Sequence, residues 1–259
     1  MKNYTLITGG TQGIGLELAR LFAKDGYNLV LVARDETGLQ TAAGELSAMG
    51  VDVITISKDL FNVDNAFSLY EDIQSKGLDI EILVNDAGQG VYGEFKDTDL
   101  YRELDIIQLN VSSLVVLTKL FLKDMITRGS GRILNVASIA GKVPGPYQAV
   151  YHGTKAFVHS FTEAVRSEMK DSVITLTSLL PGATDTDFFN KADMQSSKMV
   201  QEGDLGDAAT VAKDGYEAVM SGKDMVISGF KNKMQVAMAN VMPDSAAADN
   251  MLKQQEPEQ

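Results

Sequence analysis

The residues best suited to chemistry in this chain are Tyr151 and Lys155, four positions apart, with Ser138 thirteen residues before the tyrosine. If the segment from Tyr147 onward is helical, the tyrosine and the lysine lie one turn apart on the same face. An ammonium group beside a phenol favours the phenolate and lowers a tyrosine pKa that is ordinarily about 10. Such a tyrosine can give a proton to a carbonyl oxygen, or take one from an alcohol, near neutral pH.

We therefore predict acid/base chemistry at Tyr151, with Ser138 donating a hydrogen bond to the same substrate oxygen. The alternative is that tyrosine and lysine form a chance pair on a solvated helix face. Which interpretation holds depends on the predicted strands and helices before and after the pair.

Composition limits the class of protein. At 259 residues the chain is long enough for one large α/β domain. A net charge of -12 disfavours nucleic acid and anionic membrane as partners. The absence of cysteine excludes disulfides and thiol nucleophiles, and two histidines are a poor supply of metal ligands, so we expect no metal site. We recognise no signal peptide and no apolar run approaching the roughly 18 residues that span a bilayer, so we expect a cytoplasmic protein.

A glycine-rich turn follows the first predicted strand, residues 3–8, and opens a segment with helical apolar spacing. Strand, glycine turn and helix together direct the amides of a helix N-terminus at a phosphate. Gly9 would permit the tight turn, Gly13 a close approach to pyrophosphate, and Gly15 close packing of helix on strand. A glycine turn used only for packing is the alternative, but the flanking elements favour nucleotide binding.

The second predicted strand, residues 28–33, ends at Arg34 and Asp35. In a dinucleotide-binding fold the tip of this strand lies beside the adenosine ribose, where an acid selects NAD and an arginine accommodates the 2′-phosphate of NADP. We place the strand end at Ala33, which leaves Arg34 to clamp the phosphate and favours NADP. A shift of one residue would instead bring the Asp35 carboxylate to the ribose, so NAD is the alternative.

Predicted helices 36–49 and 63–76 alternate with strands 51–57 and 81–85. Such alternation, with apolar and β-branched strands, predicts a Rossmann-type doubly wound parallel sheet covered by helices on both faces. Ligands of such sheets lie at the carboxyl ends of the strands. The candidates at these ends are Asp59, Leu60, Asn85, Ala87 and Gly88.

The later elements continue the alternation. A long helical pattern at 99–128 carries Asn110 within an apolar stretch, so its buried amide needs partners in a structural bridge or in a site. Strand 132–138 would end at Ser138, helix 147–170 would carry the tyrosine and the lysine, and strand 173–180 would lead into residues 181–186.

Taken together, the chain resembles the short-chain dehydrogenase/reductase family, in its single-domain branch of about 250 residues. The resemblance covers residues 3 to about 190, with every motif in family order. Asp86 is the visible departure, where the family most often has a second asparagine. The matching positions are Thr8–Gly15, Asp59, Asn85–Gly88, Asn110, Ser138, Tyr151, Lys155, Pro181, Gly182 and Thr186.

The resemblance implies an oxidoreductase that transfers a hydride between nicotinamide and a carbonyl or alcohol carbon. It implies that Tyr151 is the general acid/base, that Lys155 lowers its pKa and holds the nicotinamide ribose, and that Ser138 polarises the substrate oxygen. It also implies that Asn110 holds a water of a proton relay. The cofactor residues that it implies are Gly9, Thr11, Gln12, Gly13, Ile14, Gly15, Arg34, Asp59 at adenine, Leu60, Asn85, Ala87, Gly88, Tyr151, Lys155, Pro181, Gly182, Thr184 and Thr186 at the carboxamide.

Substrate-side residues are expected in three stretches, at 89–92, at 139–148 and in a variable loop at 187–205, which the resemblance identifies as the substrate loop. Phe188, Phe189, Met194 and Met199 could cap an apolar pocket, or pack under the loop as ordinary core.

We divide the chain into a domain at 1–229 and a C-terminal helical extension and tail at 230–259. In the extension, the apolar stripe at 234–242 is expected to pack on its own domain or on a partner subunit, and a second short helix is expected from Asp244. The final residues 254–259, QQEPEQ, are expected to be disordered.

The leading functional hypothesis is an NADP-dependent carbonyl reductase or alcohol dehydrogenase for a small or medium apolar substrate. One alternative is 3-oxoacyl-carrier-protein reductase, which the acidic net charge disfavours because carrier proteins are themselves acidic. A non-catalytic NAD(P)-binding sensor or scaffold is the other, and the complete set of Asn110, Ser138, Tyr151 and Lys155 speaks against it. The resemblance also suggests a homodimer or homotetramer.

Overall fold

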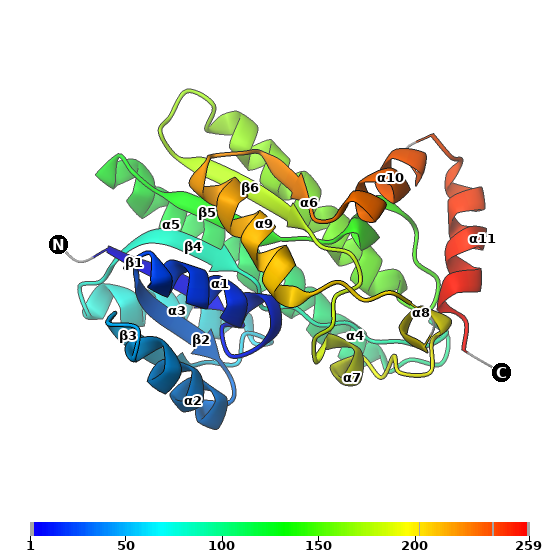
Figure 1. Ribbon diagram of the computed structural model, residues 1–259, viewed down its shortest axis with the longest axis horizontal. Coiled ribbons are helices and arrows are strands. Elements are labelled where there is room, and N and C mark those ends of the chain that lie inside the picture. The colour runs from blue at the N-terminus through cyan, green and yellow to red at the C-terminus, as the bar shows by residue number, and fades with distance from the viewer. Residues whose placement is uncertain (1–2, 202, 240, 258–259) are drawn as a thin grey trace.

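One seven-stranded parallel sheet organises the computed structural model, which describes residues 3–201, 203–239 and 241–257 (Figure 1). The strand order is β3-β2-β1-β4-β5-β6-β7, and each neighbouring pair is parallel. The predicted Rossmann-type fold is thus confirmed. The strands are β1 Asn3–Thr8, β2 Asn28–Ala33, β3 Val53–Ser57, β4 Asp79–Asn85, β5 Arg132–Val136, β6 Thr175–Leu180 and β7 Met225–Ile227.

The order reverses between β1 and β4, because the chain builds outward to β3 and then returns to the other side of β1. Loops that leave these two strands diverge to opposite sides and open a crevice at the carboxyl ends. The central strands are buried on both faces, as the apolar run of β2 illustrates with four consecutive buried residues.

Helices α1 (Gly13–Lys24), α2 (Glu36–Ser47) and α9 (Ala208–Met220) cover one face of the sheet, in front in Figure 1. Helices α3 (Val63–Ser75) and α5 (Leu114–Arg128) cover the opposite face, and α6 (Ala149–Glu168) continues that layer. Fully buried Phe22 of α1 and Phe121 of α5 mark the two apolar cores on either side of the sheet. Burying such rings on folding stabilises each layer by about 1.5–3 kcal/mol per side chain.

The long helical pattern at 99–128 is one continuous helical segment with a widened turn in its middle. It comprises α4 (Leu100–Ile107), a π-helical turn at Gln108–Ser113 and α5. By length and mean hydropathy, Leu100–Arg128 is also apolar enough to cross a membrane, which we had not expected from its interrupted apolar runs. Its apolar residues at Leu117 and Phe121 are buried against α3 and the sheet, as in a core helix of a Rossmann layer.

Several predicted boundaries differ from the structure by about two residues, including the end of β5, the start of β6 and the start of α6. Strand β5 ends at Val136, so Ser138 lies beyond it and begins a short 3-10 helix at Ile139–Lys142, with its Oγ accepting from the amide of Ala140 at 3.1 Å. Strand β6 begins at Thr175. Helix α6 begins at Ala149 because Tyr147, with φ of 62°, is in the left-handed region and cannot continue a helix.

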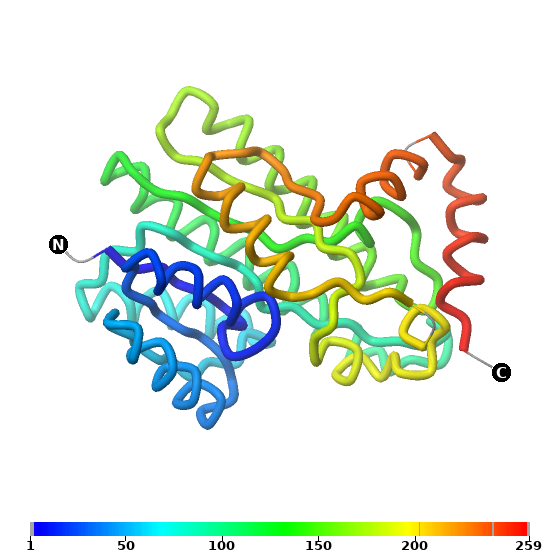
Figure 2. Tube along the Cα trace, viewed as in Figure 1, coloured from blue at the N-terminus to red at the C-terminus, as the bar shows by residue number. Residues whose placement is uncertain are grey.

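The remaining helices lie at the end of the molecule where the C-terminus is found (Figure 2). They are α7 (Phe188–Lys191), α8 (Lys198–Gln201), α10 (Phe230–Ala239) and α11 (Asp244–Gln255), of which α11 confirms the predicted second short helix. Within the predicted apolar stripe Val236 is buried, but Met234, Met238 and Val241 are exposed, so the stripe packs only in part on its own domain. Packing on a partner subunit, the other possibility, stays a prediction.

The end of the chain is ordered where we expected disorder. Helix α11 continues through Gln255, and Pro257 forms an antiparallel bridge with Ser197 beside α8. Lys198 forms an ion pair with Glu256. These contacts with the 187–205 loop explain the order, and the last two residues of the predicted disordered segment, 258–259, lie outside the described residues.

Candidate active site

A cleft of about 1070 Å³ opens at the carboxyl ends of the strands, where the strand order reverses. Its walls come from the glycine turn, the ends of β2, β4, β5 and β6, the start of α6, the substrate loop and the C-terminal helices. Most of the predicted site residues line it. Three do not, namely Gly15, Asn85 and Asn110.

The glycine turn adopts the geometry that its spacing predicts. Gly9 and Gly13 have φ of 76° and 54°, a region that favours glycine. A Cβ on Gly15 would lie 2.5 Å from the carbonyl oxygen of Gly9, so Gly15 acts beneath the turn rather than in the cleft wall. The side chain of Gln12 does not cap α1, which leaves the first amides of the helix facing the cleft. The turn therefore fits a pyrophosphate group.

The tip of β2 presents a cation and an acid with different partners. The guanidinium carbon of Arg34 lies 4.7 Å above the centre of the Phe61 ring, and its Nε is 3.8 Å from Asp59. Asp35 accepts a hydrogen bond from the amide of Thr37 at 3.1 Å and so caps α2. The half-exposed Arg34 side chain is thus a cation at the rim of the cleft beside the predicted adenosine position.

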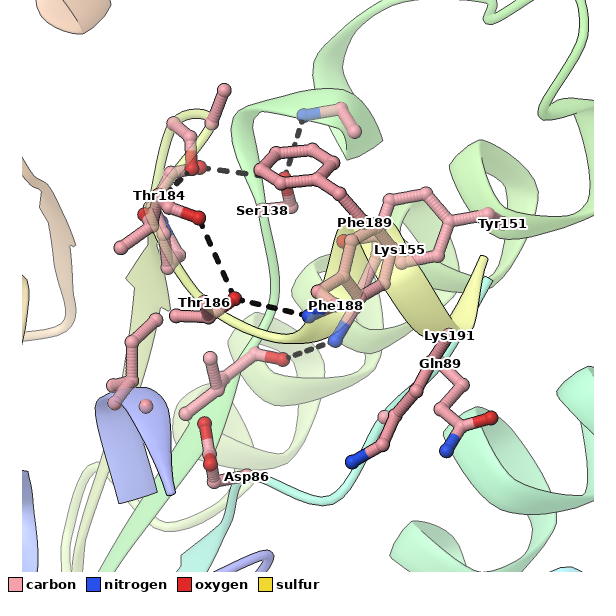
Figure 3. Close-up of a pocket in the computed structure, with 18 of the residues that line it drawn as sticks. Asp86, Gln89, Ser138, Tyr151, Lys155, Thr184, Thr186, Phe188, Phe189 and Lys191 are labelled. Carbon is pink, nitrogen blue, oxygen red and sulfur yellow. Dashed lines mark hydrogen bonds between the residues drawn. The ribbon is translucent and has the colours of Figure 1, made fainter. Parts of the chain in front are cut away.

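Tyr151, Lys155 and Ser138 come together at the inner end of the cleft (Figure 3). The ammonium group of Lys155 lies 5.8 Å from the centre of the Tyr151 ring and donates to the carbonyl oxygen of Val136 at 2.7 Å. The hydroxyl of Ser138 donates to the carbonyl oxygen of Pro181 at 3.3 Å, and its interaction with the Tyr151 hydroxyl lowers the pKa of that tyrosine. Tyr151 and Lys155, four residues apart on α6, therefore lie close to the serine that follows β5.

Burial nevertheless raises the pKa of Tyr151 to about 12, against the lowering that we predicted. Desolvation disfavours the phenolate and outweighs the interaction with Ser138. The charge of Lys155 does not offset the effect of burial, and the Asp86 carboxylate raises the pKa of the tyrosine further.

Asp86 is the functional-site residue whose role we missed. It lines the cleft, and its Oδ2 would lie 2.6 Å from a Cβ on Gly15, directly under the glycine turn. Burial raises the pKa of Asp86 to about 7, with Lys155 and the Gly15 amide opposing the shift. Burial lowers the pKa of Lys155, and Asp86 opposes that shift in turn. The carboxylate in place of the family's asparagine was the available signal.

Asn110 and Asn85 have structural partners. The Asn110 side chain holds the backbone of Gln89, accepting from its amide at 3.0 Å and donating to its carbonyl at 2.9 Å, and it donates to Thr154 at 3.0 Å. The Asn85 side chain donates to Thr118 and Asn135 at 3.1 Å and 2.9 Å. The expectation that Asn85 lines the cofactor side is corrected, because its side chain points between the sheet and α5.

The loop after β6 closes the cofactor side of the cleft. The hydroxyl of Thr184 donates to the carbonyl of Gly182 at 2.9 Å, and that of Thr186 accepts from the amide of Phe188 at 3.4 Å (Figure 3). A Cβ on Gly13 would lie 3.0 Å from the Thr186 methyl carbon, so the loop abuts the glycine turn. Pro181, Gly182, Thr184 and Thr186 thus line the cleft as predicted.

The substrate side is aromatic near the tyrosine. The rings of Phe188 and Tyr151 are 5.0 Å apart, and Phe189 and Met199 also line the cleft. Met194 is instead fully buried in a small cluster under the loop, which was the alternative interpretation for all four residues.

The C-terminal helix also lines the cleft, which we did not predict. Met251, Gln254 and Gln255 of α11 reach it, and Phe230, Asn232 and Gln235 do so from α10. A four-residue spacing of Ala247, Met251 and Gln255, all buried, was the only signal that this helix has an inner face.

Comparison with known proteins agrees with this geometry. Residues 3–197 match the family model for short chain dehydrogenases. The ketoacyl reductase HetN of Nostoc is 29% identical over 238 residues, which cover 92% of this chain and 78% of that protein. The very-long-chain 3-oxoacyl-CoA reductase of Laccaria bicolor is 37% identical over 67% of this chain, which spans only 52% of that longer protein.

Among solved structures, a short-chain dehydrogenase from Sphingobium yanoikuyae in complex with NADPH superposes with a TM-score of 0.82 at 26% identity. The match covers 96% of this chain and 99% of that one. The family accounts together for three features of the structure. They are the glycine turn at the uncapped N-terminus of α1, the parallel sheet whose strand order reverses between β1 and β4, and the Ser-Tyr-Lys cluster beside them. The chain belongs to the short-chain dehydrogenase/reductase family, and is an oxidoreductase that acts on CH–OH groups with a nicotinamide cofactor.

Proposed function

We propose that the protein transfers a hydride between NADP(H) and a ketone or secondary alcohol, with Tyr151 as general acid/base. The proposal rests on one observation. Tyr151, Ser138 and Lys155 lie together in the cleft that the glycine turn also lines.

The bound nicotinamide would supply or accept the hydride at the substrate carbon. The protein's own groups handle the proton. In the direction of reduction, the Tyr151 hydroxyl, whose pKa burial raises to about 12, is fully protonated at neutral pH and donates its proton to the substrate oxygen. Ser138 donates a hydrogen bond to that oxygen. The ammonium group of Lys155 returns a proton to the Tyr151 phenolate and holds the hydroxyl groups of the nicotinamide ribose.

The preference for NADP rests on the tip of β2. Arg34 is half exposed at the cleft, where it lies 3.8 Å from Asp59 and stacks on Phe61. A planar guanidinium held over a ring is preorganised for a phosphate. Asp35 is committed to capping α2, which supports the assignment of the ribose position to Arg34 and not to the carboxylate.

The remaining predicted roles stand as part of the proposal. Asp59 and Leu60 border the adenosine end, Ala87 and Gly88 border the ribose, and Thr186 reaches the carboxamide. Asn110 acts through Gln89 and Thr154, two contacts that fix the backbone next to Gly88 and the start of α6. Residues 1–229 form the catalytic domain, and residues 230–259 extend its substrate side.

We also propose a cytoplasmic homodimer or homotetramer with a small-molecule substrate. Its support is the exposure of large apolar side chains along one helix layer. They are Leu100, Tyr101 and Leu104 of α4 and Phe157 of α6.

A reductase of 3-oxoacyl thioesters is the second candidate, because two of the similar proteins are named ketoacyl and 3-oxoacyl-CoA reductases. Docking of an acidic carrier protein is disfavoured by the net charge of -12, so a coenzyme-linked or small ester substrate is the more compatible form.

Tyr151→Phe tests the proposal. The ring and its contact with Phe188 stay, and only the transferable proton is lost, so NADPH-dependent ketone reduction should fall by about 10³-fold or more. NADPH binding, measured by fluorescence titration, should change less than about twofold. Reduction at the wild-type rate by this variant would show that the tyrosine is not the acid.

A further inference from the structure

One aromatic ring at the rim of the cleft carries two cations. The guanidinium carbon of Arg34 lies 4.7 Å from the centre of the Phe61 ring, and that of Arg102 lies 5.1 Å from it. Arg34 follows the end of β2, Phe61 lies in the loop after β3, and Arg102 belongs to the first turn of α4. Phe61 lines the cleft together with Arg34, at the end where the adenosine of the cofactor is proposed to bind.

The Phe61 ring is a fixed support. It packs against the apolar core between the sheet and helices α3 and α5, and its backbone amide donates to Oδ1 of Asp59 at 3.2 Å. The side-chain nitrogen of Asn65 donates to the Asp59 carbonyl at 2.8 Å and holds the same turn. Arg102 is itself held by a hydrogen bond to the side-chain oxygen of Gln89. The ring therefore keeps its place through contacts that do not involve the tip of β2.

The backbone of Arg34 is held by the neighbouring strand. Its carbonyl accepts from the hydroxyl of Ser57 at 3.2 Å, and the carbonyl of Ala33 accepts from the amide of Lys58 at 3.0 Å. The side-chain Nε of Arg34 lies 3.8 Å from Oδ1 of Asp59, which is longer than a hydrogen bond. The guanidinium is thus placed by stacking on the ring and not by a bidentate pair with the carboxylate.

Stacking prepares the guanidinium for an anion. An unsupported arginine side chain loses rotamer freedom when a ligand fixes it, and that loss weakens binding. A ring beneath the guanidinium fixes its plane before the ligand arrives, and its N–H groups point outward in that plane. The second guanidinium on the ring brings two positive charges within about one Debye length of each other, which favours a dianionic phosphate.

We infer that Phe61 is a positioning residue for the 2′-phosphate of NADP, because its ring holds Arg34 in the orientation that meets the phosphate and so sets the preference for NADP over NAD. The inference rests on the proposed function, in which Arg34 binds this phosphate. It goes further by dividing the preference between residues that follow two neighbouring strands. An arginine at the tip of β2 is then not sufficient by itself.

The test compares two fragments of the cofactor that differ only in the phosphate concerned, 2′,5′-ADP and 5′-AMP. Each is titrated into the full-length protein by calorimetry at one pH and one ionic strength, and the measured quantity is the Kd for 5′-AMP divided by the Kd for 2′,5′-ADP. Phe61→Leu keeps an apolar side chain on the core and removes the ring face, so this ratio should fall about two- to fivefold. Phe61→Tyr keeps the ring face and should retain the wild-type ratio.

Phe67→Leu is the matched control, because Phe67 is exposed on α3 and lies outside the cleft lining. It should leave the ratio as it is. In an Arg34→Ala background, Phe61→Leu should also leave the ratio unchanged, since the ring then has no phosphate-binding side chain to hold. Phe61→Met takes the place of Phe61→Leu if that variant shows no cooperative thermal transition.

The outcomes separate this inference from the proposed function. A wild-type protein that binds 2′,5′-ADP no more tightly than 5′-AMP would refute the NADP preference itself. A wild type that prefers 2′,5′-ADP, with a folded Phe61→Leu that keeps the whole preference, would refute the role of Phe61 and leave Arg34 in place. Weakening of both fragments by the same factor would also refute it, because the ring would then contact the adenosine that the two fragments share.

Discussion

The two halves of the cleft are built in different ways. The centre of the cofactor side is a backbone wall, shaped by Gly9 and Gly13 in left-handed conformations and by the uncapped start of α1, which come from one stretch of chain. On the substrate side the wall is made of side chains. They come from α6, the 187–205 loop and α11, which are far apart in sequence.

The difference explains what each half tolerates. A backbone wall depends on conformations that only certain residues adopt, so a single added methyl group matters there. A side-chain wall depends on packing and on hydrogen bonds such as those of Gln255 with His152 and Tyr92, which can be exchanged singly at modest cost. We expect substitutions on the cofactor side to have the larger effects.

Gly15→Ala should have the largest effect among the binding variants. Its Cβ would meet the Gly9 carbonyl oxygen at 2.5 Å and Oδ2 of Asp86 at 2.6 Å, so the turn has to move. We expect a loss of about 3 kcal/mol in NADPH binding, roughly 100-fold, by titration. Gly44→Ala in α2 is the matched control, since its Cβ would meet no described atom within 4 Å. It should raise the free energy of unfolding by about 0.5–1 kcal/mol. Equal behaviour of the two variants would contradict a backbone-built cofactor side.

Arg34→Ala sharpens the comparison at the rim, where the cofactor side does use a side chain. Loss of a charge-assisted phosphate contact should weaken NADPH binding by about 1.5–3 kcal/mol. NADH, which lacks the 2′-phosphate, should be affected far less. Titration of both cofactors at one ionic strength checks this, and equal weakening of the two would remove Arg34 from the phosphate position.

Asp86→Asn probes the junction between the two halves. The folded protein keeps the Asp86 proton up to a pH of about 7, whereas the unfolded chain releases it near 3.8. As the pH rises through this window, proton release favours the unfolded chain, so the contribution of Asp86 to stability falls. Asparagine has no such proton.

The Tm of Asp86→Asn relative to wild type should therefore increase between about pH 4 and about pH 8, corresponding to about 1–2 kcal/mol. Asn can still accept from the Gly15 amide, which preserves the geometry under the turn. Thermal unfolding in a series of buffers measures the difference, and a constant difference across that range would argue that Asp86 is ionised throughout.

Glu256→Gln should have the smallest effect, because it tests a half-exposed contact of the substrate side. The Lys198–Glu256 pair ties the end of the chain to α8, and both side chains are about a third or more exposed. Exposed pairs contribute about 0.2–1 kcal/mol, so Tm should fall by at most a few degrees. The KM for the ketone should rise while NADPH affinity stays the same. A change in NADPH affinity instead would mean that the two halves are not independent.

The sequence by itself indicated the glycine turn and the strands and helices that frame the cofactor side. Glycines in the turn, apolar β-branched strands and helical periodicity are local signals, since each reports a backbone conformation that neighbouring residues fix. The positions of Ser138, Tyr151 and Lys155 could also be predicted, because strand ends and a helical spacing of four place them within one crossover unit. Asn85 was misassigned because its direction depends on Asn135 and Thr118, two partners that are distant in sequence.

Tertiary structure alone decided the rest. The pKa of Tyr151 follows from burial and from Asp86, neither of which can be read from the spacing of tyrosine and lysine. The order of the C-terminal tail follows from its bridge to Ser197, and the contact of Gln255 with His152 exists because α11 folds back onto α6. Local patterns fix conformation, whereas burial and long-range pairing fix the charge state and the shape of the substrate pocket.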